Sequence, residues 1–498
     1  MRAKHLLSLL VVLSQTALAD MSEELAGIWH TEIEIIGLRA ALEFELRPSP
    51  EDPEWVGRWE MLELTAWGDL QRVHIDGAAV ELDMLASIGF KGVLTPKDRS
   101  LDGVLDFEGR ELPAVFVKVD TWATQMPART DHQGLAQTTW DYHPPDGLGD
   151  GWPVSSLNED EIQDLDELFE QVVGGDYQGL DAVLVAREGQ LVLEEYFHFG
   201  DRNEIHTLQS VTKSVTSLVF GSAYDDGLIA DLDQPLHRYY EGYADSQWVK
   251  DKYPISLKHV LTMSAGLDWH EEGISYTNSR NDNWRMNRSG DMYGYILSRD
   301  RAGDVEPGDQ FAYTSGLSIL LGGVVLEATG TRIDRYAEQT LFEKMRINRY
   351  HWGAPSGQIH TGGGLYLRAR DLLKLGQLVL DNGRWNGKQV ISASWIEEST
   401  AFQVPRPNSG NDSSYGYQWW RTLLYTPRGS VQVIYASGYG GQLLWVFPKL
   451  ELVMLVLHHN PRPGEGSHTI NLQEVHDHVI PALASSKLTG FCIFRICF

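Results

Sequence analysis

The hydrophobic pattern of the chain changes once, near residue 153, and this change most limits the folds that the chain can adopt. Before it, apolar and charged residues alternate in segments such as 42–46 and 80–84, with the period of a half-buried strand. After it, strand patterns at 181–196 and 443–457 enclose a long stretch of helical pattern. Strands at both ends of a helical region predict one antiparallel sheet, assembled from the two ends of a single domain.

The N-terminus has the composition of a secretory signal. Arg2 and Lys4 precede the apolar run 6–13, and small residues ending at Ala19 follow it. We therefore expect residues 1–19 to be a signal peptide, cut after Ala19, and the protein to be exported, either periplasmic or secreted. The alternative is a short N-terminal helix of the mature fold.

The remaining chain divides into four parts. Residues 20–120 combine short strand patterns with closely spaced turn signals, which predicts a small all-β barrel-like domain. Residues 121–152 are interrupted by Pro and Gly, which indicates a linker or an arm lying along the second domain. Residues 153–485 form the predicted mixed α and β domain, whose first helix is expected to begin at a capping box of Ser156 and Glu159, and 486–498 form a tail. The tryptophans of the first domain could line a ligand cavity but are better explained as core: Trp29, Trp55, Trp59 and Trp67.

Composition excludes several partners and sites. The chain has 41 Lys and Arg against 69 Asp and Glu, for a net charge of −28. Such an acidic chain is a poor partner for nucleic acid or for an anionic membrane surface. After the N-terminal run, no segment is long and apolar enough to predict a membrane span. The only two cysteines, Cys492 and Cys497, are in the tail, so no Cys-based zinc site or disulfide framework organises the fold. We expect no cofactor and no metal, because the histidine pairs of the sequence lack a third ligand.

One short motif carries catalytic chemistry. Ser210 and Lys213 are separated by two residues at the expected start of a helix, and no other Ser-x-x-Lys occurs in the chain. Two such side chains lie on one helix face. Burial and the helix N-terminus both disfavour the ammonium form, so the amine can act as a base toward the hydroxyl. The alternative is an ordinary helix start, with a capping serine and a solvated lysine.

Two later segments fit the same chemistry. Tyr313 lies after a Pro-Gly turn and before the apolar helix pattern 317–328, where it could carry protons between a nucleophile and a leaving group. The Gly-rich segment 436–442 enters the late strand pair. A Gly-rich strand edge lets a substrate approach the backbone closely, and its N–H groups can bind an oxyanion.

These three elements, in this order and spacing, resemble the serine β-lactamase and penicillin-binding protein superfamily. The closest resemblance is to the class C-like branch with its esterases and 6-aminohexanoate-dimer hydrolases, and it covers roughly residues 140–485. It implies an α/β (α+β) catalytic domain with an antiparallel sheet and a helical subdomain, here preceded by the all-β barrel-like domain. Further matching segments are 194–197, 261–267, 362–365 and 415–420.

The resemblance also implies roles for individual residues. Ser210 is expected to be the acylated nucleophile, Lys213 its base partner, and Tyr313 the second proton carrier. The backbone N–H groups of Ser210 and Tyr439 are expected to form the oxyanion hole. Four further residues are expected to contact substrate: Ser315, Ser437, Gly438 and Gly441.

Two positions depart from the family pattern. Ser315 stands where the β-lactamases have Asn, and Ala436 stands where they have Lys or His. Loss of that cation removes a partner for the β-lactam carboxylate. We therefore expect an exported serine hydrolase that cleaves a small-molecule ester or amide. The alternatives are a β-lactamase or D-alanyl-peptidase, and a catalytically silent binding or cell-wall interaction module.

Overall fold

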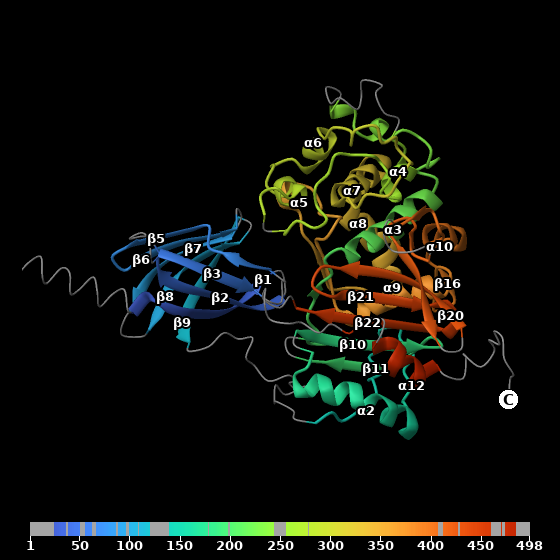
Figure 1. Cartoon of the computed structure of the whole chain (residues 1–498), viewed down its shortest axis with the longest axis horizontal. Helices are drawn as coiled ribbons and strands as arrows, with labels where there is room; N and C mark the ends of the chain where they lie inside the picture. The colour runs from blue at the N-terminus through green and yellow to red at the C-terminus, as the bar shows by residue number, and fades with distance from the viewer. Residues whose placement is uncertain are drawn as a thin grey trace, which may run out of the picture. The chain divides into compact units, whose positions relative to one another are not determined.

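The structure is a computed structural model of the whole chain (Figure 1). It describes residues 24–484 apart from 36–37, 50–54, 62–65, 86–87, 96–98, 108, 120–138, 178, 198–199, 244–254, 277, 407–411, 427–428, 460–469 and 471–473. The chain forms two compact units, Met1–Met126 and Pro127–Phe498. The expected signal peptide and the Cys492 and Cys497 tail lie outside the described residues.

The first unit is a nine-stranded antiparallel sheet that curls into a nearly closed barrel, as the alternating pattern predicts. Its strand order is β4-β3-β2-β1-β9-β8-β7-β6-β5, so the first strand lies beside the last. The Leu70 N–H donates to Gly57 O (2.8 Å) and the Gln71 N–H to Asp83 O (2.7 Å), which draws the two edge strands together. The strands are β1 (Gly27–Ile35), β2 (Leu38–Pro48), β3 (Trp55–Met61), β4 (Ala66–Asp69), β5 (Arg72–Asp76), β6 (Ala79–Leu85), β7 (Ile88–Thr95), β8 (Ser100–Phe107) and β9 (Arg110–Val119).

Aromatic rings fill the inside of this barrel. Phe44 and Phe90 each contact Phe116, at ring-centroid distances of 4.6 and 4.8 Å, and all three are fully buried. Trp29 and Trp59 are also buried, so the core interpretation is correct for these two tryptophans. Trp55 is half-buried, and the side chain of Trp67 is outside the description.

The second unit contains an eight-stranded antiparallel sheet in the order β11-β10-β22-β21-β20-β19-β18-β17. Strand β10 pairs with both β11 and β22, so the sheet joins the two ends of the domain, as expected from the pattern. Its strands are β10 (Leu180–Arg187), β11 (Gln190–Tyr196), β17 (Val404–Pro405), β18 (Ser414–Tyr415), β19 (Trp420–Thr426), β20 (Gly429–Gly438), β21 (Gln442–Phe447) and β22 (Leu452–His458). Two small sheets are formed by β12 (His206–Thr207), β13 (Tyr350–Trp352) and β14 (Leu365–Leu367), and by β15 (Arg384–Trp385) and β16 (Lys388–Gln389).

Helices cover both faces of this sheet (Figure 1). Helix α2 (Glu159–Gly174) and α12 (Ile480–Ala484) pack on one face, with a core that includes Val183 and Val456. Helix α3 (Val211–Asp225) and α9 (Ala369–Leu380) pack on the other, with a core that includes Leu184 and Leu455. The helical part between them consists of α4 (Leu257–Leu261), α5 (Asp282–Met286), α6 (Met292–Leu297), α7 (Ser315–Thr329) and α8 (Ile333–Ala337), and α10 (Ala393–Thr400) follows α9.

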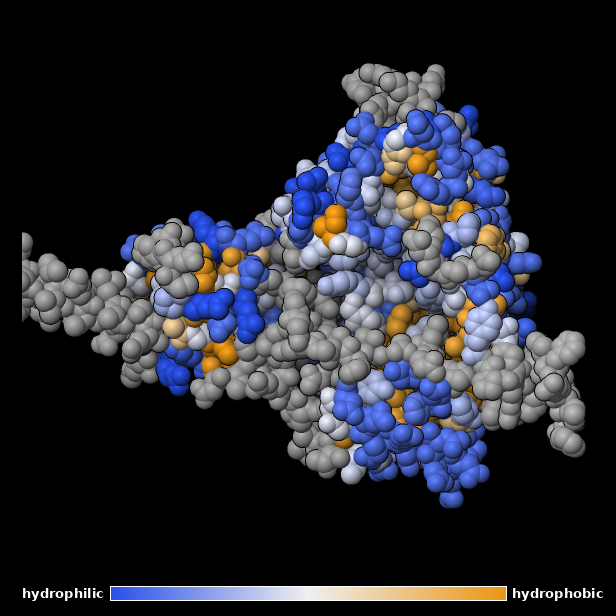
Figure 2. Space-filling model, in the orientation of Figure 1, coloured by the Kyte–Doolittle hydropathy of each residue, from blue (hydrophilic) through white to orange (hydrophobic). Residues whose placement is uncertain are grey.

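Helix α2 begins later than its sequence suggests. A capping box at Ser156 and Glu159 is the sequence-based interpretation, but the structure has it at Asn158 and Glu161, where each side chain accepts from the other's backbone N–H. The reason is that residues 159–161 are all acidic, and acidic side chains stabilise the first turn of a helix because they face the positive end of its dipole. The exposed face of α2 is hydrophilic, as Figure 2 shows at the lower edge of this unit.

Residues 139–152, the described part of the expected linker, form an arm on the second unit. Trp140 stacks on Phe169 of α2 at 4.6 Å, and Trp152 contacts Trp385 edge-on at 5.2 Å. Tyr142 OH donates to Val192 O of β11 (2.8 Å). The arm therefore belongs to the hydrophobic core of this unit.

Among the residues that the structure describes, no single helix has the length and apolar composition to cross a bilayer. The bent pair Ser315–Thr329 and Ile333–Met345 meets those two requirements only in combination, across a 74° break.

Candidate active site

Ser210 lies at the N-terminus of α3, directly after a residue in a strained conformation. Gln209 has φ 46°, in the left-handed region that is unfavourable for a residue with a Cβ. Ser210 is the N-cap residue of α3, yet its side chain makes no capping hydrogen bond. Its Oγ instead accepts from Lys213 Nζ at 2.9 Å.

Lys213 is buried beneath this serine, with 2% of its surface exposed. Its Nζ also donates to Gly362 O at 2.5 Å. Burial lowers the pKa of Lys213 to about 8, although the carboxylate of Glu271 raises it and so opposes this shift. A lysine with such a pKa is neutral in an appreciable fraction of molecules near neutral pH, so it can take a proton from Ser210.

Tyr313 faces both residues from the loop before α7. Lys213 Nζ lies 5.1 Å from the centre of its ring, and the ring stacks on Trp420 at 6.0 Å. Burial and the charge of Glu271 raise the pKa of Tyr313, while hydrogen bonds with Ser210 and Ser315 oppose the rise. Tyr313 therefore keeps its proton at neutral pH and is placed to donate it.

The tight turn between β20 and β21 lies against the nucleophile. A Cβ on Gly438, the last residue of β20, would be 2.5 Å from Leu208 O and 3.1 Å from Gln209 Cβ, so only glycine allows this approach. Tyr439 follows in the turn, and its side chain is 42% exposed. Gly441 (φ 98°) donates its N–H to Gly438 O at 3.2 Å and closes the turn.

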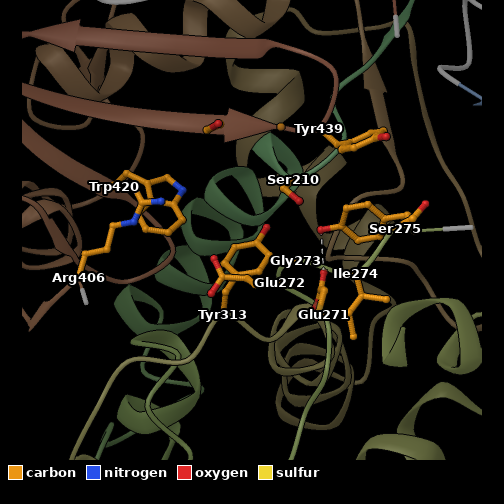
Figure 3. Close-up of a pocket in the computed structure, with 13 residues that line it drawn as sticks. Ser210, Glu271, Glu272, Gly273, Ile274, Ser275, Tyr313, Arg406, Trp420 and Tyr439 are labelled. Atoms are coloured by element: carbon orange, nitrogen blue, oxygen red, sulfur yellow. Dashed lines mark hydrogen bonds between the residues drawn. The ribbon is translucent and has the colours of Figure 1, made fainter. Parts of the chain in front are cut away.

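A cavity of about 420 Å³ opens above Ser210. Figure 3 shows Ser210 at the end of α3, with Tyr313 on one side and Tyr439 on another. The cavity is lined by Ser210, Glu271, Glu272, Gly273, Ile274, Ser275, Tyr276, Tyr313, Arg406, Trp420, Ser437, Gly438 and Tyr439.

The structure thus brings most of the predicted site residues together. Ser210, Tyr313, Ser437, Gly438 and Tyr439 line the cavity, and Lys213 lies directly below Ser210. Two other predicted residues are not in its lining. Ser315 is buried and points to Glu271, and Gly441 shapes the turn.

Glu271 is the main site residue that the sequence reasoning missed. Its carboxylate accepts from Ser315 Oγ (2.5 Å), Ser315 N (2.8 Å), Trp269 Nε1 (2.7 Å) and Tyr276 OH (3.1 Å). In the sequence, Glu271 lies outside every motif and every matching segment named above. Its partner Ser315 is far along the chain, so no local spacing links the two.

Two charged residues of the cavity wall were also missed, and the strand-core interpretation favoured for both Trp419 and Trp420 is correct only for Trp419. Glu272 and Arg406 line the cavity with opposite charges, and Arg406 lies over the Trp420 ring at 4.8 Å. The neighbouring tryptophans have different environments: Trp419 is buried in the core, whereas Trp420 lines the cavity.

Comparison with known proteins decides the family. The family model described as Beta-lactamase matches residues 165–476, which is more than half of the chain. The chain belongs to the beta-lactamase family. As a beta-lactamase-family protein, it is a serine hydrolase with the family's α/β fold, and the resemblance seen in its sequence is confirmed.

Individual relatives agree with this assignment. The 6-aminohexanoate-dimer hydrolase of Paenarthrobacter ureafaciens is 31% identical over 321 residues, which cover 61% of this chain and 76% of the relative. A solved structure from Bacillus anthracis, provisionally assigned as a 6-aminohexanoate-dimer hydrolase, has a TM-score of 0.54 at 21% identity and covers 68% of this chain and 87% of that chain. The hydrolase EstCE1, described as having promiscuous acyltransferase activity, has a TM-score of 0.52 at 14% identity and covers 68% and 100%. The two structures support the fold alone.

Proposed function

We propose that this beta-lactamase-family hydrolase cleaves a small ester or amide through a covalent acyl-enzyme on Ser210. The observation that carries the proposal is the 2.9 Å hydrogen bond between Lys213 Nζ and Ser210 Oγ, made by a buried lysine with a pKa of about 8. A serine is a weak nucleophile until an adjacent base removes its proton, and this pair provides that base.

The reaction begins with attack of Ser210 Oγ on the substrate carbonyl carbon, while its proton passes to the neutral amine of Lys213. The resulting oxyanion accepts hydrogen bonds from the backbone N–H groups of Ser210 and Tyr439. One such donor is worth roughly 3–4 kcal/mol in other hydrolases. The tetrahedral intermediate then collapses and the bond to the leaving oxygen or nitrogen breaks.

Tyr313 completes the proton transfer. Its hydroxyl donates to the leaving atom, and the Lys213 ammonium returns a proton to Tyr313. Water then attacks the acyl-enzyme along the reverse path, with Lys213 again as the base, and restores Ser210. No cofactor or metal is required by these steps.

The cavity lining favours a short substrate with an apolar centre and polar ends. Trp420, Ile274 and Tyr276 supply apolar surface, and Glu272 and Arg406 supply opposite charges. The relative from Paenarthrobacter ureafaciens acts on a 6-aminohexanoate dimer by its name. That linear amide therefore belongs in the substrate panel, together with short-chain p-nitrophenyl esters.

The test is covalent labelling followed by turnover. A fluorophosphonate should add to the purified protein in a 1:1 ratio, and peptide mass mapping should find it on Ser210. Ser210→Ala should abolish both labelling and ester hydrolysis. If Ser210→Ala is labelled and turns over as well as the wild type, the acyl-enzyme proposal is wrong.

A second candidate, β-lactam hydrolysis, is favoured by Arg406. Ala436 is buried and supplies no charge to hold a β-lactam carboxylate, but Arg406, which follows β17, lines the cavity above Ser210. A chromogenic cephalosporin separates the two candidates. If the cephalosporin is turned over as fast as simple esters, and Arg406→Ala loses this turnover, the β-lactam function is supported. If the cephalosporin is not turned over, the ester or amide hydrolase remains the proposed function.

A further inference from the structure

Two sets of polar side chains, which meet through the backbone of His458 and His459, link the segments that carry the two proposed oxyanion donors, Ser210 N–H and Tyr439 N–H. We propose that Gln442 and Asp181 are positioning residues, which hold these two N–H groups at the distance that the oxyanion requires. The inference rests on the proposed acyl-enzyme function.

Gln442 is the first residue of β21 and is fully buried. Its Nε2 donates to His458 O at 2.5 Å and to Tyr439 O at 3.3 Å, and its Oε1 accepts from His458 N at 3.1 Å. The side-chain amide therefore ties the oxyanion turn to the end of β22. Fixing the Tyr439 carbonyl limits rotation about the Cα–C bond of that residue. Its N–H belongs to the preceding peptide group, which the close approach of Gly438 to Leu208 holds in place.

Asp181 forms the second half of the connection. This fully buried carboxylate on β10 bonds His459 Nδ1 at 2.6 Å and His206 Nε2 at 2.8 Å. The other nitrogen of His206 lies 2.8 Å from Thr207 O, three residues before the nucleophile. The two histidines hold the pKa of Asp181 far below its usual range, although burial opposes this, so Asp181 stays charged.

The two halves meet through the backbone. His458 and His459 are adjacent, so Gln442 and Asp181 form hydrogen bonds with neighbouring residues at the end of β22. On the other side, Gly438 approaches Leu208 so closely that no Cβ fits between them. The segments before Ser210 and before Tyr439 are therefore held both by direct contact and by the polar chain. Charge-assisted and buried hydrogen bonds are strong enough to set such a geometry.

The decisive variant is Gln442→Met, which keeps the volume but loses the hydrogen bonds. We expect kcat for a p-nitrophenyl ester to fall by about 10²-fold, with KM nearly unchanged, because a donor is misplaced only for the transition state. The matching thionoester is the diagnostic substrate. Its sulfur accepts hydrogen bonds poorly, so we expect its kcat to fall far less than that of the ester.

Gln377→Met is the matched control, because Gln377 is equally buried but donates to Asp381 (3.0 Å) within the α9 region. It should leave both rates unchanged. Asp181→Asn is the second variant, and its kcat should also fall for the ester far more than for the thionoester. It provides the test if Gln442→Met does not fold.

The outcomes separate the two proposals. Equal losses for ester and thionoester, or an unchanged ester kcat in folded Gln442→Met and Asp181→Asn, would overturn the positioning role. Such a result would not contradict the acyl-enzyme proposal, because that proposal is tested separately by Ser210→Ala.

Discussion

At the scale of single residues, the pKa of Lys213 sets the expected pH dependence. Lys213 acts as a base only when neutral, and burial lowers its pKa to about 8. We therefore expect kcat/KM to rise with pH through about 8, because the ammonium form at lower pH cannot take the serine proton. Initial-rate measurements with a neutral ester, from pH 5 to 10, check this.

Replacement of Glu271 should move that pH dependence in a known direction. Its carboxylate raises the pKa of Lys213, so Glu271→Gln should shift the rising limb to lower pH, whatever its effect on the maximal rate. Glu272→Gln is the control, because Glu272 lines the cavity without a resolved influence on Lys213. A limb that stays in place, or moves to higher pH, in Glu271→Gln would contradict the assignment.

Gly438 should tolerate no side chain. In Gly438→Ala the new Cβ would lie 2.5 Å from Leu208 O, so β20 must move away from the nucleophile. We expect a loss of roughly 1–3 kcal/mol in the free energy of unfolding and a much lower kcat. Gly174→Ala, at a position with open space around it, should be neutral in both assays. Equal behaviour of the two variants would show that the close approach is unimportant.

The residues that could be predicted from sequence are those with local spacing or a family motif. Ser210 and Lys213 are three apart on one helix, and their contact follows from helix geometry. Glu271 could not be predicted, because its contact with Ser315 depends on how the loop before α5 folds onto α7. The charged wall formed by Glu272 and Arg406 was missed for the same reason.

At the scale of elements, the cap of α2 is a test of local stability. The Asn158 side chain accepts from the Glu161 N–H at 3.0 Å, so Asn158→Ala should lower the free energy of unfolding by about 1 kcal/mol. Ser156→Ala, two residues earlier and exposed, should change it by less than about 0.5 kcal/mol. Urea unfolding of the whole chain measures both values. If Ser156→Ala lowers the free energy of unfolding more than Asn158→Ala does, Ser156 is the functional cap.

Elements with a clear period were predicted directly, whereas the irregular arm was only one of two alternatives, the other being a linker. The alternation at 80–84 predicts a strand with one buried and one exposed face, and β6 indeed buries Val80, Leu82 and Met84. The arm 139–152 has no period, so its packing through Trp140 and Trp152 depends on surfaces formed by distant parts of the chain.

At the scale of the whole molecule, the second unit should be active without the first. Every residue that lines the cavity belongs to the unit Pro127–Phe498. We therefore expect a chain of residues 127–498 to hydrolyse p-nitrophenyl esters with a kcat/KM similar to that of the full chain. Circular dichroism must first show that the shortened chain is folded. Loss of activity in a folded fragment would assign the barrel a part in catalysis.

Export is the second prediction at this scale. The composition of residues 1–19 predicts cleavage after Ala19. The intact mass of protein collected from the periplasm or medium of a bacterial host should therefore correspond to a chain that begins at Asp20. A full-length mass, or retention in the cytoplasm, would favour the alternative of an N-terminal helix.

The pairing of β10 with β22 has a consequence for the order of folding. Val183 lies beside Val456, so the ribosome must complete nearly the whole catalytic unit before β10 can pair with β22. Until then the hairpin of β10 and β11 has an unpaired edge, which is the kind of surface that recruits other strands and aggregates. Synthesis and pairing of the last strands, rather than the formation of any helix, should therefore limit how fast the nascent chain folds.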